Sequence, residues 1–368
     1  MISRAALGLV MIVVMLVSGT VTFIFLGSRT SKIADVPEKP TAATPRAQAL
    51  RIPGTLYLSQ NGAIYSLTAG RFHALTPEAG WTQPSLYPDQ SRLLVVRRYH
   101  NYSDLYTMSR FGVVQKRLTN NVAPPRSFDT GANHWVFYPR FGSDGRIYLS
   151  YDEPKAGYAV VFSIWSMSPT GNLTQGKLWT NADDYTGGDV EALPLRGNGF
   201  IYTKYSYGPN ARLTGQLYHI TTPWNRGRAG SGWGTALTTP GEDCRSAQLS
   251  PNGKQVAMIC SYQTQLSYLV LASWNGHTLG PRVKVVRNQL VAQPTWAPDG
   301  SGIAYLAPSS GSGPFQLWFL PSAGYAPQPS PTPNYGPIVT PSPIQPTQPV
   351  QITTNNGFDA TSPMAWAH

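Results

Sequence analysis

The feature that most constrains the fold is a phrase that the chain repeats about every 50 residues. Each copy has a polar or proline-rich start, a turn, and then a run of β-forming residues. The clear copies are QPSLYPDQSRLLVV (83–96), YPRFGSDGRIYLS (138–150), RSAQLSPNGKQVAMI (245–259) and QPTWAPDGSGIAYL (293–306), and EALPLRGNGFIYT (191–203) is a weaker one. Aligned on their turns, the copies lie 55, 54, 54 and 47 residues apart. Periods of this size indicate propeller blades or another repeat array.

Each phrase predicts a β-hairpin. Pro presets φ for the second position of a type I turn, Asp or Asn suits the third, and Gly takes the left-handed residue that follows. We therefore expect a three-residue loop at each turn. Two further β-like runs follow each hairpin, such as SDLYTMSR and VVQKRLT in the first unit. Each unit then has four strands, a to d, as a propeller blade requires.

The two ends of the chain predict a shared sixth blade. Residues 362–368, SPMAWAH, match the first half of the phrase and then stop, whereas residues 52–76 begin at the turn and supply three strands. The C-terminal strand around Trp366 should therefore pair with the strand around Leu56. The sequence predicts an all-β, six-bladed propeller over residues 52–368, closed by its N- and C-terminal strands so that no edge stays open.

The repeat also resembles a known family. The pattern P-x-W-x-P-D-G-x-x-I-A-[YF], followed by an I/L-Y/W strand and a closing LT, is similar to the TolB-type repeat of six-bladed propellers. The match is specific at 294–305, good at 84–95 and 246–257, and weakest at 194–202. The resemblance covers residues 52–368 and implies the same propeller fold.

The segment before the repeats predicts a membrane anchor. Residues 5–27 are 23 positions without a charge, which is about the length needed to cross a hydrocarbon core of roughly 30 Å. Residues 1–29 are predicted to be a single-pass transmembrane signal-anchor, with a cleaved signal peptide as the alternative. The usual path of such an anchor places the propeller on the extracytoplasmic side of the membrane.

Two proline-rich stretches lie outside the repeat. Residues 30–51 are predicted to be a mobile linker between the anchor and the propeller. Residues 323–349 contain nine prolines, and proline this dense cannot join a β-ladder. We therefore interpret 323–349 as an insertion that leaves the propeller.

The charge of the chain narrows the range of partners. The formal net charge is +11, with only 12% charged residues. Nucleic acid would suit a basic chain, but an exported domain seldom meets it, and we predict no nucleic-acid partner. Anionic lipid head groups or wall polymers are the expected counter-charges. The alternative is that the excess charge is spread evenly and only aids solubility.

The two cysteines, Cys244 and Cys260, lie on the two arms of one predicted hairpin. If residues 251–253 form its loop, Ser250 faces Lys254, and the cysteines are directly opposed on the same face of the sheet. A disulfide is predicted, because an exported chain permits one. Two buried thiols are the alternative.

No sequence motif for a catalytic nucleophile, a zinc protease or a phosphate-binding loop is present. We predict no catalytic residue, no cofactor and no metal site. The d-to-a connections and b-to-c loops of a propeller share one face, which we call the upper face. Its carboxylates, tyrosines and basic residues suit a peptide or a sugar, although they could instead only cap strands. The candidate binding residues are Asp129, Asp184, Asp189, Asp243, Asp359, Arg98, Tyr99, His100, Tyr205 and Tyr207.

The a-to-b turns and c-to-d loops form the opposite, lower face. Residue 51 enters the propeller there, so this face should look toward the membrane. The candidate membrane contacts are Trp224, Arg226, Arg228 and Trp233, with a loop that touches nothing as the alternative.

These features favour a binding or scaffold module in the cell envelope, anchored to the membrane and presenting its upper face to a protein or glycan partner. An enzyme is the competing class, namely a polysaccharide-active hydrolase or lyase with its site in the upper pocket. Paired carboxylates about 5–10 Å apart would be expected for glycoside hydrolysis. A purely structural spacer is the third hypothesis. The oligomeric state and the identity of the partner stay open.

Overall fold

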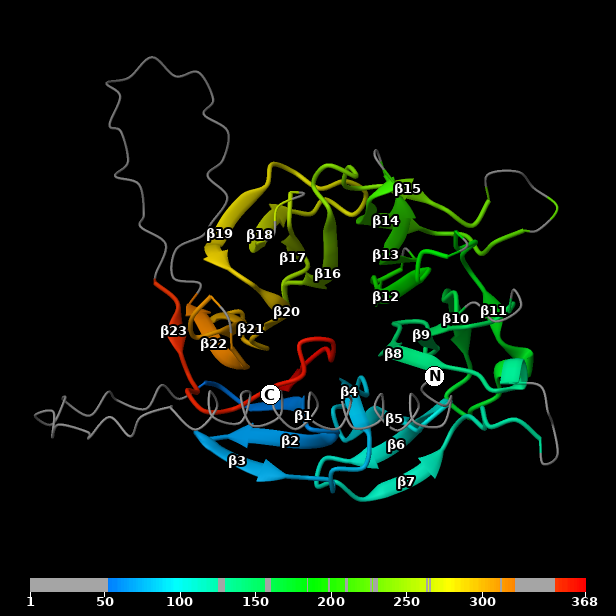
Figure 1. Cartoon of the computed structure of the whole chain (residues 1–368), viewed down its shortest axis with the longest axis horizontal. Coiled ribbons are helices and arrows are strands. Elements are labelled where there is room, and N and C mark those ends of the chain that lie inside the picture. Colours follow the sequence, from blue (N-terminus) through cyan, green and yellow to red (C-terminus); the bar gives the residue numbers. More distant parts are fainter. Residues whose placement is uncertain are drawn as a thin grey trace, which may run out of the picture. The chain divides into compact units, whose positions relative to one another are not determined.

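The computed structural model describes residues 52–124, 130–155, 160–183, 185–197, 199–208, 211–225, 227, 231–262, 264, 266–311, 313–321 and 348–368. These residues form six four-stranded sheets. Figure 1 shows the sheets arranged around a common centre. The predicted all-β, six-bladed propeller is therefore confirmed.

The blades follow one another along the chain, and strands a to d run outward from the centre. Blade 1 contains β4 (Trp81–Leu86), β5 (Arg92–Arg98), β6 (Ser103–Ser109) and β7 (Val114–Arg117). Blade 2 contains β8 (Val136–Phe141), β9 (Ile147–Tyr151), β10 (Ser163–Met167) and β11 (Lys177–Leu178). Blade 3 contains β12 (Asp189–Pro194), β13 (Phe200–Tyr207), β14 (Leu213–Ile220) and β15 (Thr235–Ala236). Two short 3-10 helices lie in connections, at Thr130–Ala132 and Leu173–Gln175.

The second half of the ring has the same plan. Blade 4 contains β16 (Cys244–Leu249), β17 (Gln255–Cys260), β18 (Ser267–Ser273) and β19 (Val283–Gln289). Blade 5 contains β20 (Ala292–Trp296), β21 (Gly302–Pro308), β22 (Phe315–Pro321) and β23 (Val350–Gln351). Blade 6 contains β24 (Ala365–Ala367), β1 (Thr55–Gln60), β2 (Ala63–Thr68) and β3 (Arg71–Ala74).

Blade 6 joins the two ends of the described propeller, as the sequence predicts. In its antiparallel ladder Trp366 pairs with Leu56 and Ala365 pairs with Tyr57. The indole N–H of Trp366 also donates to the carbonyl of Pro53 at 2.6 Å. The C-terminal strand thus supplies the inner strand of a blade whose other strands come from the start of the propeller.

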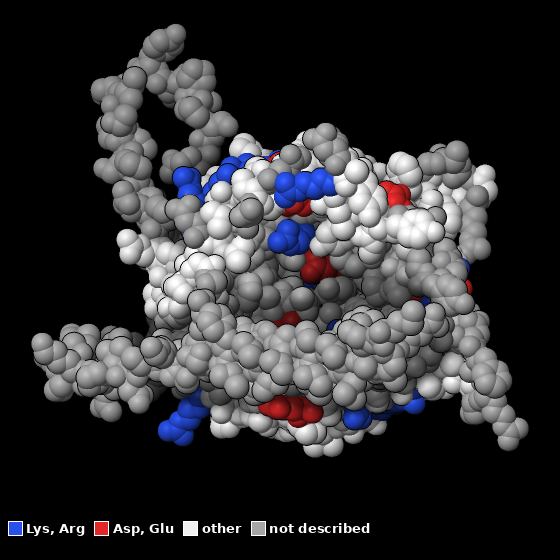
Figure 2. All heavy atoms as spheres, viewed as in Figure 1, with Lys and Arg blue, Asp and Glu red and all other residues white. Residues whose placement is uncertain are grey.

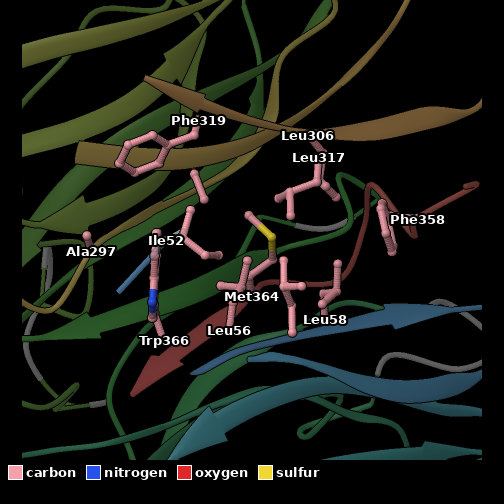
Figure 3. Packing of buried hydrophobic residues seen from close by; sticks show 12 residues of the cluster. Ile52, Leu56, Leu58, Ala297, Leu306, Leu317, Phe319, Phe358, Met364 and Trp366 are labelled. Carbon is pink, nitrogen blue, oxygen red and sulfur yellow. The ribbon is translucent and has the colours of Figure 1, made fainter. Parts of the chain in front are cut away.

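The core of the molecule lies between the blades. Six clusters of buried apolar side chains each fill the space between two neighbouring sheets. Figure 3 shows the cluster between blades 5 and 6, where Leu56 and Trp366 lie opposite Leu317 and Phe319. Sheets buried on both faces explain the near-continuous apolar runs in the sequence, because each blade has a neighbour on either side.

The hairpin turns correct one prediction. The loop of blade 2, residues 143–145, has the expected three residues. In blades 1, 4 and 5 the loop has four, since the last paired residues are Tyr87 with Arg92, Ser250 with Gln255, and Ala297 with Gly302. In all four loops an Asp or Asn side chain accepts the N–H two residues further on. These N–H groups belong to Ser91, Arg146, Lys254 and Ser301.

The closing LT of the repeat holds strand d to strand c. In five blades the Thr hydroxyl accepts the backbone N–H of a strand-c residue at 2.9 Å, and the residue before the Thr donates its own N–H back to the same residue. The threonines are Thr76, Thr119, Thr180, Thr238 and Thr353. Their positions explain why the repeat ends on this dipeptide.

The predicted anchor, residues 1–29, and the predicted linker, residues 30–51, lie outside the described residues, as does 323–349 except for its last two positions. Within the described residues, no helix has the length and apolar character needed to cross a membrane.

Candidate functional site

The inner strands carry a repeated distortion. In blades 1 to 5 strand a contains a β-bulge at the equivalent place. The residue at each bulge has a positive φ although it is not glycine, and such a conformation costs about 1–3 kcal/mol. These residues are Gln83 (54°), Tyr138 (53°), Glu191 (59°), Ser246 (56°) and Gln293 (47°). Strain of this kind persists only where the surroundings enforce it, and it is common at functional sites.

The bulge residues are hydrogen-bonded from blade to blade around the channel. The N–H of Tyr138 donates to the side-chain oxygen of Gln83 at 2.6 Å, and the N–H of Ser246 donates to the carboxylate of Glu191 at 2.9 Å. The N–H of Gln83 in turn donates to the hydroxyl of Ser362 at 2.8 Å. The bulge removes these N–H groups from the ladder, so each one takes an acceptor from the preceding blade.

Proline follows the bulge residue in three blades, at Pro84, Pro139 and Pro294, and Pro363 follows Ser362 at the start of the inner strand of blade 6. Because proline has no N–H, it fits a bulge without the loss of a ladder hydrogen bond. The first half of the repeated phrase therefore encodes the inner strand of the channel.

Charged groups lie along the channel beside the bulges. Figure 2 shows both basic and acidic atoms in a central hollow of the displayed face. Glu191 has both carboxylate oxygens within 3.1 Å of the Ser246 hydroxyl. Arg140, two residues after the bulge of β8, lies in the electrostatic field of Glu191, and burial lowers the pKa of its guanidinium. Arg245 precedes the bulge of β16 and remains partly exposed.

Two tyrosines complete this part of the channel. Burial first, and then the charge of Glu191, raises the pKa of Tyr138 far above its ordinary value and the pKa of Tyr205 to about 12. Both hydroxyls therefore stay protonated at neutral pH. Asp359, in the connection between blades 5 and 6, also acts on the Tyr138 hydroxyl, so these groups face the same space.

A strip of aromatic rings runs from the upper face into the channel. Trp135 stacks on Phe137 with 5.9 Å between ring centroids, and Phe137 also contacts Phe162 at 5.6 Å and Tyr138 at 6.3 Å. The guanidinium of Arg98 lies 5.6 Å from the Trp135 ring centroid. All four rings are partly exposed, and we call Trp135, Phe137, Tyr138 and Phe162 the aromatic strip. It offers flat apolar faces beside hydrogen-bond donors, a combination that suits a peptide or a sugar.

The predicted upper-face residues from strand b and the b-to-c loops fall into several groups. Arg98 joins the aromatic strip and Tyr205 lines the channel. Tyr99 instead stacks on Tyr102 at 4.4 Å and shares a hydrogen bond with Tyr106 at 2.8 Å, while His100 is exposed. Tyr207 is exposed and donates to the carbonyl of Tyr185 at 3.0 Å.

The predicted carboxylates are engaged by their own neighbours. Asp189 is fully buried 3.4 Å from the Lys204 ammonium, and burial raises the pKa of Asp189 to about 6 against the opposing charge of that lysine. Asp243 accepts the N–H of Gly215 at 2.8 Å and the hydroxyl of Ser261.

Asp359 is engaged in the same way, because it accepts the N–H of Thr361 at 2.9 Å. Asp129 and Asp184 lie outside the described residues. The carboxylates that the structure describes therefore hold loops in place.

The predicted membrane loop is described only in part. Trp233 is 46% exposed, its ring centroid lies 5.6 Å from the Lys204 ammonium, and its carbonyl accepts the Tyr202 hydroxyl at 2.5 Å. Trp224 is partly exposed, and Arg226 and Arg228 lie outside the described residues. Contact of this loop with a membrane stays a prediction.

The cysteines form a disulfide between β16 and β17. Cys244 pairs with Cys260 in the ladder, and both are fully buried. The register that led to this pairing contains two compensating shifts. The loop is one residue longer than predicted, so Ser250 faces Gln255 and not Lys254, and the bulge at Ser246 shifts the register back before the cysteines.

A separate cavity of about 600 Å³ lies on the lower face between blades 3 and 4. Its wall consists of residues 194–196, 249–253 and 274–276, which belong mainly to turns. None of the predicted binding residues lines it. Over the part of the chain that the structure describes, no group of three or more His, Cys, Asp or Glu side chains is placed to hold a metal ion.

Apart from Tyr205, sequence reasoning missed the channel residues, although the repeated phrase contained a signal for those at the bulges. When the phrases are aligned, the column just before the proline contains Gln83, Tyr138, Glu191, Ser246 and Gln293. This column is polar or aromatic in every blade, at a strand position where a buried apolar residue would otherwise be expected.

No family model matches the sequence, and no curated protein matches it. Among solved structures, the chain is similar to TolB from Acinetobacter baumannii, with 16% identity, a TM-score of 0.53, and coverage of 74% of this chain and 62% of that one. It is also similar to a TolB from Agrobacterium tumefaciens, with 12% identity, a TM-score of 0.54, and coverage of 84% and 92%. The chain thus spans less than two thirds of the first of these proteins.

A puromycin-hydrolyzing peptidase of Mycobacterium tuberculosis has a TM-score of only 0.45, with 11% identity and coverage of 74% and 45%. A similarity this low carries no argument. The fold of this chain is therefore that of a TolB-like six-bladed β-propeller, and these identities show the fold alone.

Proposed function

We propose that this chain is a membrane-anchored, extracytoplasmic binding scaffold, and that a segment of a partner protein lies along the aromatic strip and enters the upper mouth of the channel. The observation that carries the proposal is the strip itself. Four partly exposed rings lead to a channel in which arginine and tyrosine donors have no hydrogen-bond partner within the described part of the chain. Aromatic faces beside free donors are the usual composition of a protein-binding surface.

The anchor and the orientation are part of this proposal. The chain enters the propeller at Ile52, before the b strand of blade 6, and this is the lower side of the ring. An anchor at residues 1–29 would then hold the lower face toward the membrane and leave the strip accessible to a partner. The buried disulfide is consistent with an oxidising compartment.

The competing enzymatic function receives less support from the described residues. A general acid or base needs a carboxyl group that is free to exchange a proton with the substrate. Glu191 accepts from Ser246, and Asp359 accepts from Thr361 and Thr82. We therefore favour recognition over hydrolysis of a polysaccharide.

Site-specific photo-crosslinking in intact cell envelopes tests the proposal. A photoreactive residue at Val160, an exposed position in the b-to-c loop beside the strip, should give one discrete protein adduct. The same residue at Phe111, which is 87% exposed on the lower face, is the control and should not give that adduct. Trp135→Ala should weaken the Val160 adduct. An adduct that is glycan only, or that is the same from both positions, would contradict the proposal.

A further inference from the structure

Two arginines of the channel make no direct ion pair with any described residue. Arg140 and Arg245 are partly buried on the inner strands of blades 2 and 4, yet neither guanidinium makes a hydrogen bond or an ion pair with any described residue. The other partly buried arginines each have a hydrogen bond, an ion pair or an aromatic face, and they are Arg92, Arg97, Arg110, Arg146 and Arg282. Arg140 and Arg245 therefore differ from every other partly buried arginine that the structure describes.

The acidic groups nearby do not meet this need. Glu191 lies between the two arginines along the ring, but its oxygens accept from the N–H and the hydroxyl of Ser246. Its charge acts on Arg140 from a distance, without an ion pair within 4 Å. A partly buried guanidinium has given up part of its hydration, and no hydrogen bond from a described residue replaces it.

The remaining polar groups are also donors. The hydroxyls of Tyr138 and Tyr205 have no hydrogen-bond partner among the described residues, and both stay protonated at neutral pH for the reasons given above. Two guanidiniums and two hydroxyls thus offer donors around Glu191, whose oxygens accept from Ser246 and Thr203 and from none of these four groups. The missing component is an acceptor that carries negative charge.

We propose that Tyr138, Arg140, Tyr205 and Arg245 form a carboxylate-binding wall of the channel, and that this wall selects a partner segment bearing an Asp or Glu side chain or a free C-terminus. Arginine suits this role because its planar fork can donate two parallel hydrogen bonds to one carboxylate. The inference rests on the proposed function for the source of the carboxylate, since a protein partner supplies both kinds.

Three unlabelled hexapeptides separate the two sources. Acetyl-(Glu)6-amide carries side-chain carboxylates only, acetyl-(Gln)6 with a free C-terminus carries the terminal carboxylate only, and acetyl-(Gln)6-amide carries neither. Their binding to the full-length chain in detergent is measured by isothermal titration calorimetry. At least one carboxylate peptide should bind about 10- to 100-fold more tightly than acetyl-(Gln)6-amide, because a hydrogen bond to a charged group contributes this much. The peptide that binds more tightly identifies the source of the carboxylate.

The variants assign the preference to the wall. Arg140→Gln with Arg245→Gln should abolish the difference between the peptides. Arg196→Gln with Arg71→Gln removes the same two charges from exposed positions and should preserve the preference. Thermal melting of each variant verifies that it is folded. Equal binding of all three peptides, or a preference that survives the double substitution, would overturn the inference.

The crosslinking experiment keeps the two proposals apart. If the Val160 adduct forms equally well with the double variant, the scaffold function stands and the carboxylate wall is wrong. If the peptides behave as expected but no protein adduct forms in the envelope, the wall stands as a carboxylate site and the protein partner is wrong.

Discussion

The ring closure can be tested at a single side chain, Trp366. Its side chain is only 7% exposed and lies between blades 5 and 6. The ring contacts Phe319 at 6.1 Å between centroids, and the indole N–H donates to the Pro53 carbonyl at 2.6 Å. Trp366→Ala would remove this packing from the three-residue strand that closes the propeller, β24.

We expect Trp366→Ala to lower the free energy of unfolding by about 3–5 kcal/mol, the range for a buried aromatic replaced by alanine. This corresponds to a change of about 100-fold or more in the folding equilibrium, since about 1.4 kcal/mol is a factor of ten. Part of the loss comes from the Pro53 carbonyl, which loses its donor. The effect should be large because β24 has no other large apolar residue to hold it in place.

The measurement is urea denaturation of the full-length chain followed by far-ultraviolet circular dichroism. Phe111→Ala is the control, because Phe111 is 87% exposed and its removal should change the stability by about 0.5 kcal/mol or less. If both variants unfold at the same urea concentration, Trp366 does not hold the ring closed. The account of blade 6 given above would then be wrong.

Three further perturbations follow from the structure. Replacement of both Cys244 and Cys260 by serine should lower the free energy of unfolding by about 3 kcal/mol, because their disulfide closes a loop of about 15 residues. Urea denaturation of the two proteins under non-reducing conditions measures the difference. Asp189 has its pKa raised to about 6 by burial, so its contribution to stability is present below about pH 4 and is lost as the pH rises to 6. Asp189→Asn should therefore flatten the fall in thermal midpoint between pH 4 and 6. Gly112→Ala should be strongly destabilising in thermal melts, because φ is +88° and a Cβ would lie 2.0 Å from the Leu75 carbonyl oxygen. Gly311 has open space around it, so Gly311→Ala is the control and should be neutral.

The architecture could be predicted because the repeat encodes it redundantly. Each blade has its own turn and its own apolar strands, and five of the six have the closing threonine, so an error in one copy does not alter the number of blades predicted. The predicted three-residue loop was wrong in blades 1, 4 and 5, yet the cysteine pairing was correct, since the bulge at Ser246 offset the longer loop of blade 4. The alternation of apolar and polar residues and the residue types of the turns predict sheets well, but they do not reveal a bulge in the middle of a strand.

The site was harder to predict, because its side chains are defined by the channel and not by local sequence. Carboxylates on the upper connections were chosen by their position in the chain, but Asp189 and Asp243 are used to hold loops inside the molecule. Arg140 was not selected, since nothing in the sequence around it distinguishes it from a surface arginine. Only the ring of six inner strands brings it close to Glu191.

The bulge ring and the carboxylate-binding wall can be separated by stability. The positive φ of Gln83 and its neighbours is compensated by hydrogen bonds between blades, so this part of the channel has a structural explanation. Gln83→Ala should destabilise the propeller by about 1–3 kcal/mol, because it leaves the Tyr138 N–H without its acceptor. Arg140 has no such compensation, and removal of a desolvated charge that lacks a partner is neutral or stabilising. Arg140→Gln should therefore keep or raise the urea midpoint. A residue that lowers the stability of the fold is retained for another reason, such as binding. If Arg140→Gln lowers the urea midpoint as much as Gln83→Ala does, Arg140 supports the fold and this argument for a binding role fails.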